Sequence, residues 1–258
     1  MTAILSHILP GGRAELQAFG GGMTPPAANG ADPLGSGMWD MHRADLLGAP
    51  EVWRTDPGLR LLAATNAEDA RHVPVLADAT GLTGVERIVV TIDYSPFPLA
   101  LVFHPGRALP LLGFGVKYEI AGPIRASALS GGEWIMGGAF VDAMGGGCSA
   151  PAVTHARPDW QDGFGEMRAR LWPDTGRLRV GIRHPMDTGL ADGVPAHHLT
   201  DLILTDGRGD EIARLEIHEP LEENPVLTFL LPADLARGSV GITARDTNGF
   251  RFSGEVST

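Results

Sequence analysis

Val116-Lys117-Tyr118-Glu119-Ile120 alternates apolar and charged side chains, the pattern of a strand with one buried face. Residues 85–90 indicate a second such strand. Similar short apolar runs recur along the chain, roughly 8 to 12 residues apart and separated by turn residues, which is typical of a β-sandwich. These stretches predict an all-β fold.

The predicted strands form two groups of seven, on either side of a Gly/Pro-rich break in the middle of the chain. The first group lies at 59–63, 73–77, 85–93, 99–104, 111–120, 124–129 and 133–143. The second lies at 164–172, 178–184, 199–205, 211–217, 226–231, 240–246 and 250–256. Seven strands can build one sandwich, so the chain is predicted to contain two.

Glycine and proline content marks the domain boundaries. The first 37 residues show no sustained periodicity and are expected to be disordered, and residues 38–48 predict a short helix ended by Gly48. The predicted organisation is a tail at 1–37, a first domain at 38–150, a linker at 151–162 and a second domain at 163–258.

Composition narrows the class of protein. A formal charge of −11 and a pI near 5.2 argue against nucleic acid, because phosphate recognition needs basic surfaces. No apolar run approaches the roughly 20 residues that span a bilayer, so we expect a soluble chain without a membrane partner. Residues 1–10 suggest an export signal only faintly.

The only cysteine lies in Gly145-Gly146-Gly147-Cys148-Ser149-Ala150-Pro151. Glycine and small residues predict a flexible arm made of Gly145, Gly146, Gly147 and Ser149, with the Cys148 thiol exposed for nucleophilic or redox chemistry. A single thiol lacks the paired spacing of zinc or iron–sulfur sites, so neither a metal nor another cofactor is predicted there. The alternative is an ordinary loop that happens to contain a cysteine.

Several strings resemble a known family, the thiosulfate-oxidation carrier SoxYZ, in the form where both subunits are fused in one chain. Residues 144–148 resemble the Gly-Gly-Cys end of SoxY. SoxZ-like strings follow at Ile182-Arg183-His184-Pro185-Met186-Asp187-Thr188-Gly189, at 224–229 and at Asp246-Thr247-Asn248-Gly249. The resemblance covers about residues 38–258.

The resemblance implies two immunoglobulin-like β-sandwich domains and a carrier, not an enzyme. Sulfur intermediates would be attached covalently to Cys148, with the glycines as a swinging tether. Implied partners are a haem cytochrome thiol oxidase and a sulfate-releasing hydrolase, and the implied location is the bacterial periplasm.

One departure from the family concerns the end of the arm. In separate SoxY subunits the cysteine lies at the C-terminus, whereas here the chain continues through Ser149-Ala150-Pro151. This form resembles fused carriers associated with quinoprotein dehydrogenases, so proteins of that system are the alternative partners. Cargo and partner both stay open.

Thiol chemistry gives two further expectations. A cysteine of ordinary pKa, about 8.5, is only a few per cent thiolate at neutral pH, and no Lys or Arg lies between Trp134 and His155. A cation that activates Cys148 should therefore come from the other half or from a partner. Two exposed arms can also join through a Cys148–Cys148 disulfide and form a dimer.

Two alternative functions come from other classes. A metal-binding electron-transfer sandwich would draw ligands from a group of residues in the second half: His184, Asp187, His197, His198 and His218. The blue-copper spacing is poor, because Cys148 has His155 seven residues later and no methionine before Met167. A binding module with an incidental cysteine is the other alternative. No nucleophile–base motif for an enzyme is found.

Overall fold

The computed structural model describes residues 16–18, 32–156 and 159–258. Strands dominate the described residues, so the prediction of an all-β fold is confirmed. The helices are α2 (Trp39–Leu47) and the short 3-10 helix η1 (Val153–Ala156). As predicted, α2 ends at Gly48, whose positive φ of 79° lets its N–H donate to the Arg43 carbonyl.

Within the described ranges the strands form two sheets. The seven-stranded sheet has the order β1 (Leu16–Ala18), β3 (Arg60–Ala64), β5 (Val73–Asp78), β8 (Leu109–Val116), β15 (Val226–Leu230), β12 (Arg177–Ile182) and β11 (Met167–Trp172).

The ten-stranded sheet contains nine strands in one path. Their order is β17 (Arg251–Val256), β16 (Val240–Asp246), β13 (Leu199–Asp206), β14 (Glu211–Ile217), β7 (Leu99–His104), β6 (Val85–Ile92), β9 (Gly122–Ser130), β10 (Glu133–Ala143) and β2 (Trp53–Arg54). The tenth, β4 (Asn66–Ala67), pairs with β10.

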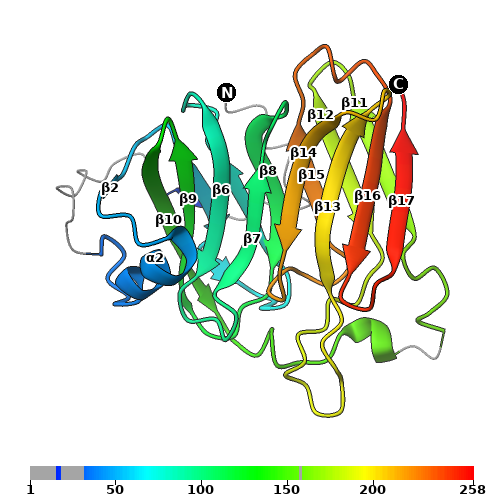
Figure 1. Ribbon diagram of the computed structural model, residues 1–258. Coiled ribbons are helices and arrows are strands. Elements are labelled where there is room, and N and C mark those ends of the chain that lie inside the picture. The colour runs from blue at the N-terminus through cyan, green and yellow to red at the C-terminus, as the bar shows by residue number, and fades with distance from the viewer. Residues whose placement is uncertain (1–15, 19–31, 157–158) are drawn as a thin grey trace.

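Both sheets run through both halves of the chain (Figure 1). In the ten-stranded sheet β7 pairs with β14, with Phe103 opposite Leu215. In the seven-stranded sheet β8 pairs with β15, with Leu112 opposite Phe229. The two predicted sandwiches are thus joined edge to edge in both layers, and the division into two domains stays a prediction.

The largest hydrophobic cluster of the described residues lies between the sheets and contains residues of both halves. Phe103 of β7 and Phe229 of β15 meet edge to face at its centre, with ring centroids 6.0 Å apart and both side chains fully buried. The halves are therefore joined both by backbone pairing and by hydrophobic packing.

All fourteen predicted strands are present, most of them within two or three residues of the predicted bounds. The largest difference concerns the stretch that alternates most clearly, because β8 ends at Val116 and does not reach residue 120. Beyond Val116 the backbone leaves the ladder, since Lys117 N–H donates to the Pro220 carbonyl and Tyr118 N–H donates to the Ala70 carbonyl. Lys117 and Tyr118 are consequently buried side by side.

The predicted disordered tail needs a correction for its described residues. Residues 16–18 form β1 against β3, and the turn at 32–37 packs on the first half. Asp32 binds the fully buried guanidinium of Arg125 at 2.8 Å, because that cation needs carboxylates around it and also binds Asp93 at 2.6 Å. The rest of the predicted tail lies outside the described residues.

No helix in the described ranges is long and apolar enough to cross a membrane.

The shared core predicts that the halves unfold together. Phe229→Ala should lower the free energy of unfolding by about 3–5 kcal/mol, since it removes a large side chain from a close-packed site. Urea denaturation followed by circular dichroism, with hydrogen exchange on peptides from each half, would measure this. Phe140→Ala, at a side chain that is 46% exposed, is the control. Two separated midpoints for the two halves would contradict the shared core.

Candidate functional site

The glycine run after β10 folds back onto the first half. Gly145 and Gly146 have φ values of 87° and 78°, which side chains other than glycine rarely adopt. Gly146 N–H donates to the Glu119 carbonyl at 3.0 Å, and Gly147 N–H donates to the Tyr118 carbonyl at 2.8 Å. A Cβ on Gly147 would lie 2.3 Å from the Ala70 carbonyl oxygen, so glycine is required for this close approach.

The Glu119 side chain binds the turn that carries the cysteine. Its carboxylate accepts hydrogen bonds from Cys148 N–H and Ser149 N–H, both at 3.0 Å, and from the Ser149 hydroxyl at 2.9 Å. Bonds to a carboxylate are stronger than bonds between neutral groups. Glu119 therefore holds residues 148 and 149 in one conformation.

The second half closes the site from the other side. The Thr188 hydroxyl donates to the Cys148 carbonyl at 2.6 Å, and Asp187 accepts from Ala152 N–H at 3.4 Å. Both residues belong to the loop after β12, which contains the predicted SoxZ-like string. The only cysteine thus lies where the two halves meet.

The thiol itself is inaccessible: Cys148 has an exposed fraction of 0%. Its Sγ lies 3.7 Å from the Lys117 carbonyl oxygen. The prediction of an exposed thiol is therefore wrong, because the glycines that were expected to free the arm instead let its backbone pack directly on residues 70 and 118. The predicted mobility of Gly145, Gly146, Gly147 and Ser149 stays a prediction.

The cation beside the thiol is Lys117 of the first half, so the prediction that it comes from the other half or from a partner is wrong. Lys117 is the only lysine in the chain, it is 6% exposed, and its ammonium group donates to the Met186 carbonyl. Burial lowers the pKa of Lys117 to about 8, against the opposing charges of Cys148 and Asp187. A lysine with this pKa is still mostly protonated at neutral pH.

Burial and three neighbouring residues determine the pKa of the thiol. Burial raises the pKa of Cys148 to about 11; the Lys117 charge lowers it, the Glu119 charge raises it, and a hydrogen bond with Ser95 lowers it. Desolvation is thus the dominant effect, and the docked thiol is a poor nucleophile.

The sequence interpretation missed Lys117 and Glu119 as parts of this site. Both were interpreted as outward side chains of an extended strand, and they lie about thirty residues before Cys148. The sequence contains one lysine, Lys117, and one cysteine, Cys148. This was the signal that could have indicated a site shared by the two residues. Their proximity depends on the end of β8, which the alternation did not reveal.

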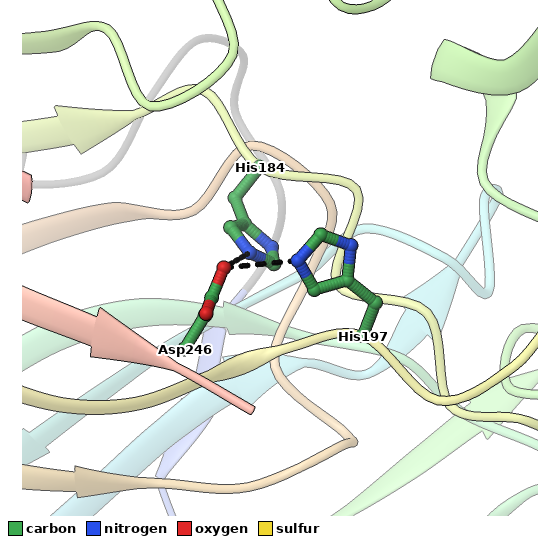
Figure 2. A group of neighbouring side chains, drawn as sticks. All are labelled: His184, His197 and Asp246. Carbon is green, nitrogen blue, oxygen red and sulfur yellow. Dashed lines mark hydrogen bonds and ion pairs between the residues drawn. The ribbon is translucent and has the colours of Figure 1, made fainter. Parts of the chain in front are cut away.

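Of the candidate metal ligands in the second half, the structure brings His184 and His197 together and adds Asp246. Their ligand atoms lie within 4.8 Å of one another, and both imidazoles point at the same carboxylate oxygen (Figure 2). The distances to Asp246 Oδ2 are 3.4 Å for His184 and 2.9 Å for His197.

The other three candidates do not join this group. Asp187 binds His155 at 2.6 Å, and His198 lies 3.5 Å from Glu219. His218 is partly buried on the loop after β14, where burial lowers its pKa.

Hydrogen bonds within the protein satisfy the His184 group. His184 Nδ1 accepts from Met186 N–H at 3.1 Å, so the ring proton of the neutral imidazole lies on Nε2 and faces Asp246. Asp246 Oδ1 accepts from the N–H groups of Asn248 and Phe250. Ligation through His184 Nε2 would place a proton on Nδ1, against the Met186 N–H. The geometry therefore favours a structural tie that fixes the loop contacting Cys148.

The comparisons with known proteins concern mainly the first half. The family model described as "Sulfur oxidation protein SoxY" matches residues 43–148. Those residues are SoxY-like. The match ends at Cys148, the only cysteine, and supports a sulfur-oxidation carrier rather than an enzyme. No curated protein matches the chain.

Two solved structures show weak similarity. A beta-glycosidase from Bacteroides vulgatus has 12% identity and a TM-score of 0.25 over 78% of this chain. A glycosyl hydrolase family 2 member from Bacteroides cellulosilyticus has 10% identity and a TM-score of 0.22 over 73% of this chain. The chain spans about a quarter of the length of each, 24% in both cases. At these TM-scores neither similarity bears on function.

Burial of the thiol predicts slow alkylation. Because Cys148 is fully buried and its pKa is raised to about 11, it should react with iodoacetamide at pH 8 at least about a hundredfold more slowly than in the urea-unfolded chain, where the thiol is exposed and has an ordinary pKa. Rates measured by mass spectrometry at pH 8 test this, and equal native and unfolded rates would refute it.

Burial of His184 predicts a loss of stability in acid. Desolvation and the neighbouring His197 lower the pKa of His184 from 6.5 to about 4. Between these values the unfolded chain binds a proton that the folded chain does not, so the free energy of unfolding should fall by on the order of 2–3 kcal/mol as pH decreases from about 6.5 to about 4.

His184→Gln should reduce the dependence of the free energy of unfolding on pH. Urea denaturation at pH 7, 6, 5 and 4 would measure this. His72 and His198, whose pKa values are raised by Glu222 and Glu219 despite burial, act in the opposite direction and are common to both proteins. Identical slopes for the variant and the unmodified chain would show that His184 does not titrate in this range.

Proposed function

We propose that this chain is a covalent carrier of sulfur intermediates, attached to Cys148, for partner enzymes that oxidise sulfur compounds. The observation that carries the proposal is the SoxY match over residues 43–148, which ends at the only cysteine of the chain. Two further observations support the carrier function. A glycine run precedes Cys148, and Cys148 lies where the two halves meet.

A SoxZ-like second half is part of the proposal. The loop with His184, Met186 and Thr188 carries the SoxZ-like string. In the structure Thr188 of this loop contacts the Cys148 carbonyl, and Met186 accepts from Lys117 next to the thiol. Backbone pairing of β7 with β14 and of β8 with β15 joins the two halves as closely as the subunits of a permanent complex. By analogy with the family we also propose a periplasmic location.

With thiosulfate as the cargo, loading and unloading both take place at the Cys148 sulfur. The S–H bond of Cys148 breaks and its sulfur joins the outer sulfur of thiosulfate. One proton leaves to solvent, and two electrons pass to haem irons of a cytochrome partner, each of which accepts one electron. A hydrolase then uses water to release sulfate and two protons, leaving a persulfide anion on Cys148. In this scheme the chain supplies the thiol and its surroundings, and the partners supply redox and hydrolytic chemistry. Quinoprotein dehydrogenase-associated proteins are the alternative partners.

In this structure the Cys148 turn is closed over its own thiol. A thiol with an exposed fraction of 0% and a raised pKa cannot reach a partner's active site. The turn must therefore open transiently from Glu119 and Thr188 for cargo to be attached. The same opening is needed for a Cys148-linked dimer.

The alternatives make different predictions for simple variants and analyses. If the chain is a binding module, Cys148→Ser leaves every activity intact. If it is a metal-binding electron-transfer protein, metal analysis finds a stoichiometric ion and His197→Gln removes it.

The proposed carrier should contain cargo when isolated from its native host without reductant. Intact mass before and after reductant should differ by a sulfur, sulfonate or thiosulfonate group located on the Cys148 peptide, and Cys148→Ser should lack it. If the thiol is unmodified from the host and also stays unmodified after incubation with thiosulfate and an oxidant, the carrier function is wrong.

A further inference from the structure

Glu119 makes more of the hydrogen bonds that hold the Cys148 turn than any other residue. Glu119 accepts three hydrogen bonds from Cys148 and Ser149, and its backbone carbonyl accepts a fourth from Gly146. We infer that Glu119 is the positioning residue that keeps the arm docked while Cys148 carries no cargo, and that a sulfur group attached during a transient opening prevents the arm from docking again. This rests on the proposed carrier function and specifies its regulation.

Packing supplies the first reason for release. The thiol is fully buried, with Sγ against the Lys117 carbonyl, and Gly147 lies so close to the Ala70 and Tyr118 carbonyls that not even a methyl group would fit there. A sulfonate or thiosulfonate adds several heavy atoms to Sγ. Because protein interiors are close-packed, such a group cannot be added while the turn stays in place.

Charge supplies the second reason. The expected cargo groups are anionic, and the nearest negative charge that acts on the thiol belongs to Glu119. Lys117 offsets part of this repulsion but also donates to the Met186 carbonyl. Burying an additional anion beside a carboxylate costs more than exposing it to water, so the loaded turn is more stable outside the site.

The consequence is that the position of the arm depends on whether Cys148 carries cargo. Empty, the turn is docked and the thiol is shielded from oxidants. Loaded, it projects from the joint between the halves, where a partner enzyme can bind it. A partner can then distinguish the loaded carrier from the empty one without contacting the cargo first.

Hydrogen exchange on a chemically loaded protein tests the inference. Tetrathionate reacts with the Cys148 thiolate: a new S–S bond forms, thiosulfate leaves with the electron pair of the broken bond, and the cysteine retains a thiosulfonate group. Amide exchange at residues 146–149 should be at least about tenfold faster in the loaded than in the empty protein, because these N–H groups lose their acceptors on opening. Unchanged exchange in fully loaded protein overturns the inference.

Two substitutions test the role of Glu119 in the empty protein. Glu119→Ala removes three acceptor contacts, and Gly147→Ala places a Cβ against two carbonyl oxygens. Both should raise the alkylation rate of Cys148 at pH 8 by at least about tenfold, since opening of the turn limits access to the thiol. Glu119→Gln, which keeps one acceptor oxygen, should give an intermediate rate.

Matched controls separate release from general destabilisation. Glu86→Ala removes an exposed carboxylate from β6, and Gly181→Ala adds a Cβ that meets nothing closer than 3.9 Å; both should keep the rate of the unmodified chain. If Glu119→Ala and Gly147→Ala fold with unchanged melting temperatures and react as slowly as these controls, Glu119 does not hold the arm. Because loading is chemical, this outcome is independent of whether cargo is found in the host.

Discussion

Strand pairing between the halves is the constraint on which the rest of the structure depends. The β7–β14 and β8–β15 ladders make both sheets continuous, and Phe103 and Phe229 pack across the layers at the same place. Because each ladder fixes the register of one half against the other, the loop after β12 has a defined position over the end of β8. The cysteine turn is held in the gap between these two segments.

In this site the glycines allow the backbone of the Cys148 turn to pack closely on the first half, in contrast to the flexible arm that was expected of them. Gly145 and Gly146 provide the positive φ values that reverse the chain after β10, and Gly147 permits backbone contact with two carbonyl oxygens. Glu119 and Thr188, one from each half, then satisfy the polar groups of the turn. A thiol in these surroundings is protected by burial and by its raised pKa, which suits a carrier that must not react before it meets its partner.

Most strands could be predicted from the sequence, because alternation and turn residues are local signals. Even the end of α2 at Gly48 followed from the need for a left-handed residue there. The extension of β8 to residue 120 was wrong because alternation cannot reveal that Pro220 and Ala70 capture the next backbone N–H groups. The continuity of the sheets could not be predicted either, because the sequence of an edge strand does not show which strand pairs with it. For the same reason Cys148 was recognised as important, but its burial beside Lys117 was not.

The chain is held on both sides of the cysteine. Upstream, β10 ends at Ala143; downstream, Val153 and Thr154 donate their N–H groups to Glu223 at 2.7 and 2.8 Å. Cys148 lies five residues from Ala143 and five from Val153, so a fully extended chain allows the thiol to move at most about 17 Å from either point. Two fixed ends also force the backbone to enter and leave any partner as a double strand. An enzyme that accepts this thiol therefore needs an open cleft wide enough for a hairpin, and a narrow tunnel that admits only a chain end would exclude it.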